Sequence, residues 1–152
     1  RIIEGDVFSG VKVDEEHDRM SYSIDQITII PEGDDVHEVF GWAMPRLNQY
    51  SHSRSYFSWL MPKKEYVLDA RVKGGRRAMI MSGEYDRVFP MDIYPEFLLK
   101  GIIAFNINDM EARGIYEVAP EDFSVCEFVD TSKIPLQQIV RQGLDELYKE
   151  MN

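Results

Sequence analysis

The clearest pattern of apolar and polar residues lies in the C-terminal part of the chain. After Pro135, apolar residues recur every three to four positions, which is one face of an α-helix. Pro95 suits the first position of an earlier helix, which continues through the apolar run FLLKGIIAF. Between these helices we expect one helix capped by Asn108 and stopped by Gly114, and another that starts at Pro120. The apolar face expected for the last helix consists of Leu136, Ile139, Val140, Leu144, Leu147, Tyr148 and Met151.

The first part of the chain has the pattern of strands and turns. RIIEGDVFSG and SYSIDQITII are rich in β-branched residues, and a charged loop separates them. YVLDARV (66–72) and RAMIMSG (77–83) predict two more strands, joined through Gly74 and Gly75, because glycine tolerates the positive φ of tight turns. We therefore predict an α+β protein with a β-rich region at residues 1–94 and a helical region at residues 95–152.

Composition and charge narrow the class of protein. The 152 residues are 44% hydrophobic and 29% charged, as in a globular protein of one domain or two small ones. The formal net charge of −10 argues against a partner such as nucleic acid, whose phosphates need a cationic surface. The longest apolar runs are too short to cross a bilayer. The chain starts at Arg1, within a strand-like segment and without an initiator Met, so we expect a fragment of a longer protein.

No catalytic or metal-binding constellation is predicted. His17, His37 and His52 do not have the spacing of metal ligands on a helix. The acidic stretch DEEHD (14–18) could hold a hard cation in principle, but it lacks the glycine and the ligand spacing of a calcium loop. The single cysteine, Cys126, sits in the apolar stretch FSVCEFV, where we expect a buried, inert thiol. We predict no catalytic residue, no metal and no bound cofactor.

Two groups of residues are candidates for binding. Crowded aromatic side chains could line a hydrophobic ligand site or an interface, or could cover a small core; they are Tyr50, Tyr56, Phe57 and Trp59. A basic island of net charge +4 includes Lys63, Lys64, Arg71, Lys73, Arg76 and Arg77, with Glu65 and Asp69. Within it, the Gly-Gly-Arg-Arg stretch could bind an anion or form a basic turn, and the island as a whole suits an acidic partner.

Several motifs, in order, resemble a known family. They are Arg1–Gly10 (RIIEGDVFSG), Phe40-Gly41-Trp42 with Pro45, Phe57-Ser58, Arg76-Arg77-Ala78-Met79, Gly83, Tyr85, Val88-x-Pro90-Met91-Asp92-Ile93-x-Pro95, Leu98-Leu99, Glu121-Asp122, Cys126-x-Phe128-Val129, Lys133 and Arg141. In this order and spacing, across nearly the whole chain, they resemble the C-terminal part of NqrA, a subunit of the bacterial sodium-translocating NADH:quinone oxidoreductase.

The resemblance implies a fold, with one departure from the family pattern. It implies a β-grasp-like domain of the soluble-ligand-binding (SLBB) type at residues 1–94, followed by a small C-terminal helical bundle at residues 95–152. Family members often carry Cys-x-Phe-Val-Cys, whereas Asp130 stands at the second cysteine position here. One cysteine cannot hold an iron–sulfur cluster, which needs about four thiolates. The cluster of the related complex I flavoprotein is therefore not expected in the helical region.

The resemblance also implies a function. The parent enzyme couples NADH oxidation and quinone reduction to sodium export, with flavins and iron centres on other subunits. NqrA is its peripheral member at the cytoplasmic face of the bacterial inner membrane. The chain would then be an inactive, cofactor-free docking portion whose partners are the other subunits. Residues near quinone or at a docking surface would be Tyr56, Phe57, Trp59, Arg76 and Arg77.

Two other function classes remain open from the residues alone. The chain could be a stand-alone small-ligand module in which the aromatic residues between Tyr50 and Trp59 line a pocket. It could also be an independent hydrolase, although no catalytic triad or metal-ligand spacing favours that class. Saturable binding of an apolar ligand would favour the first, and turnover of a simple ester or phosphate the second.

Overall fold

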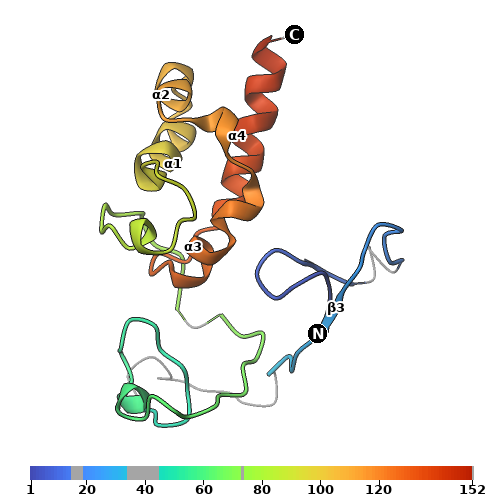
Figure 1. The fold of residues 1–152 in the computed structure, drawn as a ribbon, viewed down its shortest axis with the longest axis vertical. Helices are drawn as coiled ribbons and strands as arrows, with labels where there is room; N and C mark the ends of the chain where they lie inside the picture. Colours follow the sequence, from blue (N-terminus) through green and yellow to red (C-terminus); the bar gives the residue numbers. More distant parts are fainter. Residues whose placement is uncertain (15–18, 34–44, 73, 152) are drawn as a thin grey trace. The chain divides into compact units, whose positions relative to one another are not determined.

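A computed structural model describes residues 1–14, 19–33, 45–72 and 74–151 (Figure 1). The chain forms two compact units, Arg1–Gly75 and Arg76–Asn152, and each is described by itself. A mixed content of strands and helices agrees with the α+β class expected from the sequence. Residues 76–94 pack with the helices that follow, so the helical unit begins before Pro95. A family domain boundary at residue 94 stays a prediction.

The first unit contains a small antiparallel sheet. Strand β1 (Ile2–Glu4) lies between β2 (Val11–Lys12) and β3 (Ile27–Ile29). The first strand ends early because Gly5, at φ 98°, takes a left-handed conformation and Asp6 then turns the chain. The Asp6 carboxylate accepts the backbone N–H groups of Phe8 and Ser9 at 2.6 and 2.8 Å, which is the hydrogen bonding of an Asx-turn.

The predicted hairpin around Gly74 and Gly75 is wrong. Residues 66–72 and 77–83 carry no strand, and the two segments belong to different compact units. Val67 and Val72 are 87% and 74% exposed, so β-branched residues there have no buried face to pack. Backbone groups of 77–79 instead bond within the helical unit: the Arg77 N–H donates to the Ser132 carbonyl at 2.8 Å. The charged loop predicted at residues 14–18 lies mostly outside the described residues, as does the Phe40-Gly41-Trp42 motif.

The remainder of the first unit is irregular. Residues 45–72 contain one helical turn, the 3₁₀ segment η1 (Phe57–Leu60). Among the described residues of this unit, the buried apolar side chains are those of Ile3 and Tyr56. The unit is therefore held by turns and local hydrogen bonds more than by an apolar core.

The second unit is helical. Its elements are η2 (Tyr85–Arg87), α1 (Pro95–Ile103), α2 (Ile107–Ala112), η3 (Ile115–Glu117), η4 (Pro120–Phe123), α3 (Ser124–Val129) and α4 (Leu136–Met151). α4 packs against α1 and α3, and α1 packs against α2 (Figure 1). Their buried apolar residues form one core, consisting of Tyr85, Phe89, Leu98, Leu99, Ile102, Met110, Ile115, Val118, Phe123, Cys126, Val129, Leu136, Val140 and Leu147.

Most helix boundaries follow the predicted signals. Pro95 is the first residue of α1, and α4 begins directly after Pro135. Gly114 follows α2 at φ 84°, a conformation that glycine adopts without strain. The predicted cap was placed two residues late, because Asn106 and not Asn108 accepts the Asp109 N–H, at 3.3 Å.

The apolar face predicted for α4 is buried along most of its length. Leu136, Val140 and Leu147 are in the core, and Ile139 and Leu144 pack against it. Tyr148 and Met151 are 72% and 70% exposed, so the buried face ends before the last turn of the helix.

Candidate functional site

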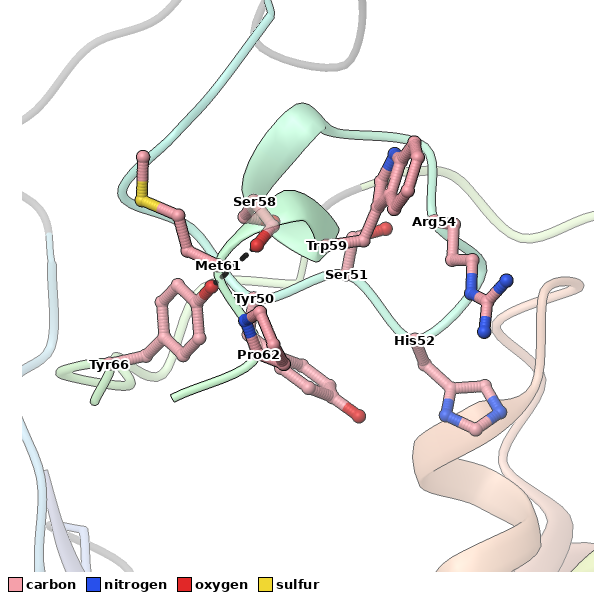
Figure 2. Close-up of a pocket in the computed structure, with 9 residues that line it drawn as sticks. All are labelled: Tyr50, Ser51, His52, Arg54, Ser58, Trp59, Met61, Pro62 and Tyr66. Atoms are coloured by element: carbon pink, nitrogen blue, oxygen red, sulfur yellow. Dashed lines mark hydrogen bonds between the residues drawn. The ribbon is translucent and has the colours of Figure 1, made fainter. Parts of the chain in front are cut away.

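Described residues of the first unit line a shallow, open cleft of about 190 Å³ (Figure 2). It is built from two neighbouring parts of the chain, the loop from residue 50 to residue 54 and the segment from η1 to residue 66. Its lining residues are Tyr50, Ser51, His52, Arg54, Ser58, Trp59, Met61, Pro62 and Tyr66.

Local hydrogen bonds and ring contacts give the cleft its shape. Tyr50 and Tyr66 meet edge to face, with ring centroids 6.0 Å apart. The Tyr66 hydroxyl donates to the Ser58 carbonyl at 3.1 Å, and this contact joins the far side of the loop to η1 (Figure 2). On the opposite side, the Ser55 N–H donates to the Ser51 hydroxyl at 2.9 Å. Arg54 has φ 56°, a left-handed conformation that strains a residue with a side chain.

The two ends of the cleft differ in chemistry. His52 and Arg54 lie together at one end, and Tyr66 closes the other (Figure 2). Aromatic faces between the two ends could stack on a planar apolar group, and the imidazole and guanidinium could donate hydrogen bonds to an oxygen acceptor. Tyr50 and Trp59 are 42% and 50% exposed. The cleft is therefore an open surface feature and not an enclosed reaction chamber.

The residues proposed from the sequence have different positions. Trp59 lines the cleft, whereas Tyr56 and Phe57 are not among its lining residues: Tyr56 is buried and Phe57 is 55% exposed. Arg76 and Arg77 are exposed residues of the second unit. The five candidates therefore do not form a single described site.

Several lining residues are not indicated by the sequence pattern. From the sequence, His52 is considered only as a possible metal ligand, and Tyr66 is placed in a predicted strand. Arg54 and Met61 are also missed. The sequence offers one signal for Arg54 and Met61: both lie in a stretch that has several aromatic residues and no Asp or Glu. The Tyr66 contact with Ser58 depends on the three-dimensional course of the loop, which the sequence pattern does not contain.

The basic island has several internal partners. Lys64 bonds to the carbonyl of Leu47 at 3.1 Å and to the side chain of Asn48, and Arg71 forms an ion pair with Asp69. Lys73 lies outside the described residues, and the island includes residues of both units. The basic side chains are therefore divided between two units.

A buried polar group surrounds Asp130 in the helical unit. The fully buried Asp130 carboxylate accepts hydrogen bonds from the Tyr85 hydroxyl at 2.9 Å and from the N–H groups of Ser132 and Ile134 at 2.8 Å. Burial, together with the hydrogen bond to Asp130, raises the pKa of Tyr85. This arrangement connects η2 to the segment between α3 and α4.

Cys126 is fully buried one turn before Asp130. Burial raises the pKa of the Cys126 thiol to about 12, with a smaller contribution from the Asp86 carboxylate. The expected burial of this thiol is confirmed. A thiol of such a high pKa is a poor nucleophile and a poor metal ligand near neutral pH.

The described ranges contain no candidate membrane span and no candidate metal cluster. None of the helices in these ranges has the length and apolar character needed to cross a bilayer. Across the same part of the chain, His, Cys, Asp and Glu side chains nowhere gather in a group of three or more that could hold a metal ion.

Comparison with known proteins finds relatives that carry the same name in several bacteria. The chain is 34% identical over 150 residues to the NqrA subunit of the Na(+)-translocating NADH-quinone reductase of Vibrio atlanticus, and 36% identical to that of Haemophilus influenzae. It is 34% identical to the same subunit of Neisseria meningitidis serogroup B. The chain is therefore similar to NqrA along nearly its whole length. No protein-family model matches the sequence.

The match to NqrA covers almost all of this chain but only part of each relative. Each alignment covers 99% of this chain but 33% of the relative, so the chain spans about one third of the length of the NqrA proteins that it matches. The resemblance expected from the sequence motifs is confirmed over nearly the whole chain. The names of these relatives describe one component of a sodium-translocating NADH-quinone reductase.

Proposed function

We propose that this chain acts as a docking portion of NqrA in a sodium-translocating NADH:quinone reductase. The observation that carries the proposal is the similarity to NqrA along 99% of the chain. In this proposal the parent complex couples NADH oxidation and quinone reduction to sodium export, at the cytoplasmic face of the inner membrane. The flavins and iron centres belong to other subunits, and this portion holds no cofactor and has no activity by itself.

The proposal includes a fold for the first unit. The β-grasp-like, SLBB-type domain suggested by the resemblance contains an antiparallel sheet, and the β2-β1-β3 sheet is compatible with part of one. The helical unit would be the bundle of the related complex I flavoprotein without its cluster. The filled core around Cys126 and Asp130 supports this, because hydrogen-bonded and apolar side chains occupy the interior there.

The surface that we assign to docking in the helical unit includes Arg76 and Arg77. Both are exposed beside a unit rich in carboxylates, and basic side chains can pair with an acidic neighbour in the complex. Reversing both charges should weaken attachment by at least about tenfold, since charge pairs across an interface contribute to both rate and affinity.

The test uses a chimera in which this chain replaces the matching third of the Haemophilus influenzae NqrA. Arg76→Glu with Arg77→Glu should reduce co-purification of the chimera with the other subunits. Arg87→Glu, at another exposed arginine of the same unit, is the matched control and should leave co-purification unchanged. Equal loss for both sets of variants, or no loss for either, would contradict the assignment.

A second candidate function is the binding of a small ligand. Within the complex, the chain would then lie near the quinone. The observation that favours it is the cleft between Tyr50, Trp59 and Tyr66. Titration of the chain with a short-chain ubiquinone, followed by amide NMR, separates the two functions. Saturable shifts confined to residues 50–66 would support a ligand site, and their absence up to the solubility limit would leave the docking role alone.

A further inference from the structure

The 3₁₀ turn η1 carries an unusual set of exposed apolar side chains. Phe57, Trp59, Leu60 and Met61 are 55%, 50%, 59% and 42% exposed, although they are large and almost consecutive. Ser58, at 2% exposure, is the one buried residue of the turn, and Tyr56, just before the turn, is buried as well. We call residues 57–61 the apolar tip.

Hydrogen bonds at its base hold the apolar tip in this outward orientation. Tyr66 bonds to the Ser58 carbonyl, and the Met61 N–H donates to the same carbonyl at 3.0 Å. Lys64 joins the end of the turn to Leu47 and Asn48. In Figure 2, Trp59 and Met61 project to opposite sides of the Tyr66–Ser58 contact. These hydrogen bonds therefore hold the loop so that its apolar side chains stay exposed and do not fold back on the unit.

The charge around the apolar tip is opposite to that of the whole chain. Between Glu38 and Glu65 the sequence has no Asp or Glu, while the chain as a whole has a net charge of −10. The same stretch carries four cations, Arg46, Arg54, Lys63 and Lys64. Arg54 and Lys63 flank the tip on its two sides in the sequence, and both are exposed. An apolar centre is thus bordered by basic residues and lacks nearby carboxylates in the sequence.

We propose that the apolar tip inserts into the interfacial region of an anionic lipid bilayer. Tryptophan and phenylalanine favour the headgroup boundary, and flanking Lys and Arg side chains are attracted to anionic headgroups. Contact cores between proteins are depleted in lysine, whereas Lys63 and Lys64 closely follow the tip. This combination favours a lipid surface over a protein as the occupant. The inference needs no other subunit and does not depend on the proposed function.

Vesicle binding of the 152-residue chain tests the proposal. A Trp42→Phe background leaves Trp59 as the single tryptophan, because the chain has two. Vesicles of phosphatidylcholine alone are compared with vesicles that contain about one third phosphatidylglycerol. We expect co-sedimentation with the anionic vesicles, a blue shift of Trp59 emission, and quenching of that emission by lipids brominated on the acyl chain. Binding should weaken as salt is added, because screening reduces the attraction of the basic residues.

Variants at exposed positions separate the contributions without disturbing folding. Phe57→Ser should reduce partitioning about tenfold, because it removes a large apolar side chain from the inserted surface. Val67→Ser is the matched control, since Val67 is 87% exposed in the same unit but outside the tip. Arg54→Gln and Lys63→Gln should each reduce binding to anionic vesicles about fivefold, as expected for one basic residue at the surface. Lys12→Gln, at an exposed position in β2, should have little effect.

Three results would overturn the proposal. The first is binding that is equal for neutral and anionic vesicles. The second is binding without quenching of Trp59 by brominated lipid, which would place the contact elsewhere on the chain. The third is the absence of vesicle binding, which would mean that the apolar tip faces protein. Failure here would leave the co-purification test of the docking role unaffected, since no other subunit is present in the vesicle experiment.

Discussion

At the scale of single residues, Asp130 illustrates how one buried carboxylate organises the helical unit. Its two oxygens accept the Tyr85 hydroxyl and two backbone N–H groups that lead into α4. Replacing it with asparagine should lower the free energy of unfolding by about 2–3 kcal/mol, because one oxygen becomes an amide donor that faces a backbone donor.

The Asp130→Asn prediction can be checked by urea unfolding followed by circular dichroism. Asp145→Asn, at an exposed position of α4, is the matched control and should change the unfolding free energy by less than about 0.5 kcal/mol. Similar small effects for both variants would show that the Asp130 hydrogen bonds contribute little to stability.

Because the Cys126 thiol is buried, we predict that the folded protein loses stability at alkaline pH. Well below pH 9 the thiol is protonated in both folded and unfolded chains, so it has no pH effect there. Between pH 9 and about 12 the unfolded chain releases the proton while the folded chain retains it, which favours unfolding. The free energy of unfolding should therefore fall with rising pH, by at most about 1.4 kcal/mol per pH unit from this group.

Cys126→Ala tests this origin of the alkaline slope. The alanine variant should be less stable at neutral pH, because it leaves a small cavity, but should lose less stability above pH 9. The comparison is made by urea unfolding well below and just above pH 9, with the Cys126→Ala protein as the reference for every other group that titrates in this range. Parallel pH profiles for the two proteins would argue against the assigned pKa.

At the scale of elements, the packing of α4 on α1 depends on a glycine. A Cβ atom on Gly143 would lie 2.8 Å from Cγ2 of the buried Ile102. Gly143→Ala should therefore destabilise the unit by about 1 kcal/mol, since overpacking exceeds the gain in helix propensity. In Gly101→Ala the nearest contact would be an ordinary 3.5 Å, so this control in α1 should gain up to about 1 kcal/mol. Thermal unfolding that shifts both variants in the same direction would contradict this packing.

The helices were predictable from local signals, whereas only two of the four predicted strands form, as β1 within residues 1–10 and β3 within residues 21–30. The helix boundaries lie at residues with clear start or stop signals, namely Pro95, Gly114 and Pro135. The apolar period of α4 repeats over several turns. The misplaced cap at Asn108 arose because Asn106 has the same capping chemistry two residues earlier. A strand needs a partner elsewhere in the chain, so β-branched residues at 66–72 and 77–83 gave a false signal.

At the scale of the whole molecule, the two units should differ in stability. The helical unit has a continuous apolar core, whereas Ile3 and Tyr56 are the buried apolar residues among the described part of the first unit. Amide hydrogen exchange should therefore show strong protection in α1 and α4 and much weaker protection at residues 45–72. Equal protection in both units would mean that the first unit is stabilised by contacts other than its apolar burial.

The candidate site was only partly predictable from the sequence. The aromatic crowding drew attention to residues 50–59, where Trp59 lines the cleft, and the family resemblance could be stated from the motifs alone. The inward position of Tyr56 and the participation of Tyr66 depend on how the loop folds back through the Ser58 carbonyl. Arg76 and Arg77 were proposed together with the aromatics as quinone-proximal or docking candidates, but they belong to the other compact unit.

The central claim is that this chain can take the place of the matching third of NqrA. The most direct measurement is sodium-stimulated NADH:quinone reductase activity in membranes from cells that carry only the chimeric Haemophilus influenzae NqrA. We expect that the chimera supports this activity, while an NqrA truncated before the matching third does not. Activity that the truncated protein supports equally well, or a chimera that is stably expressed but fails to restore activity, would contradict the claim.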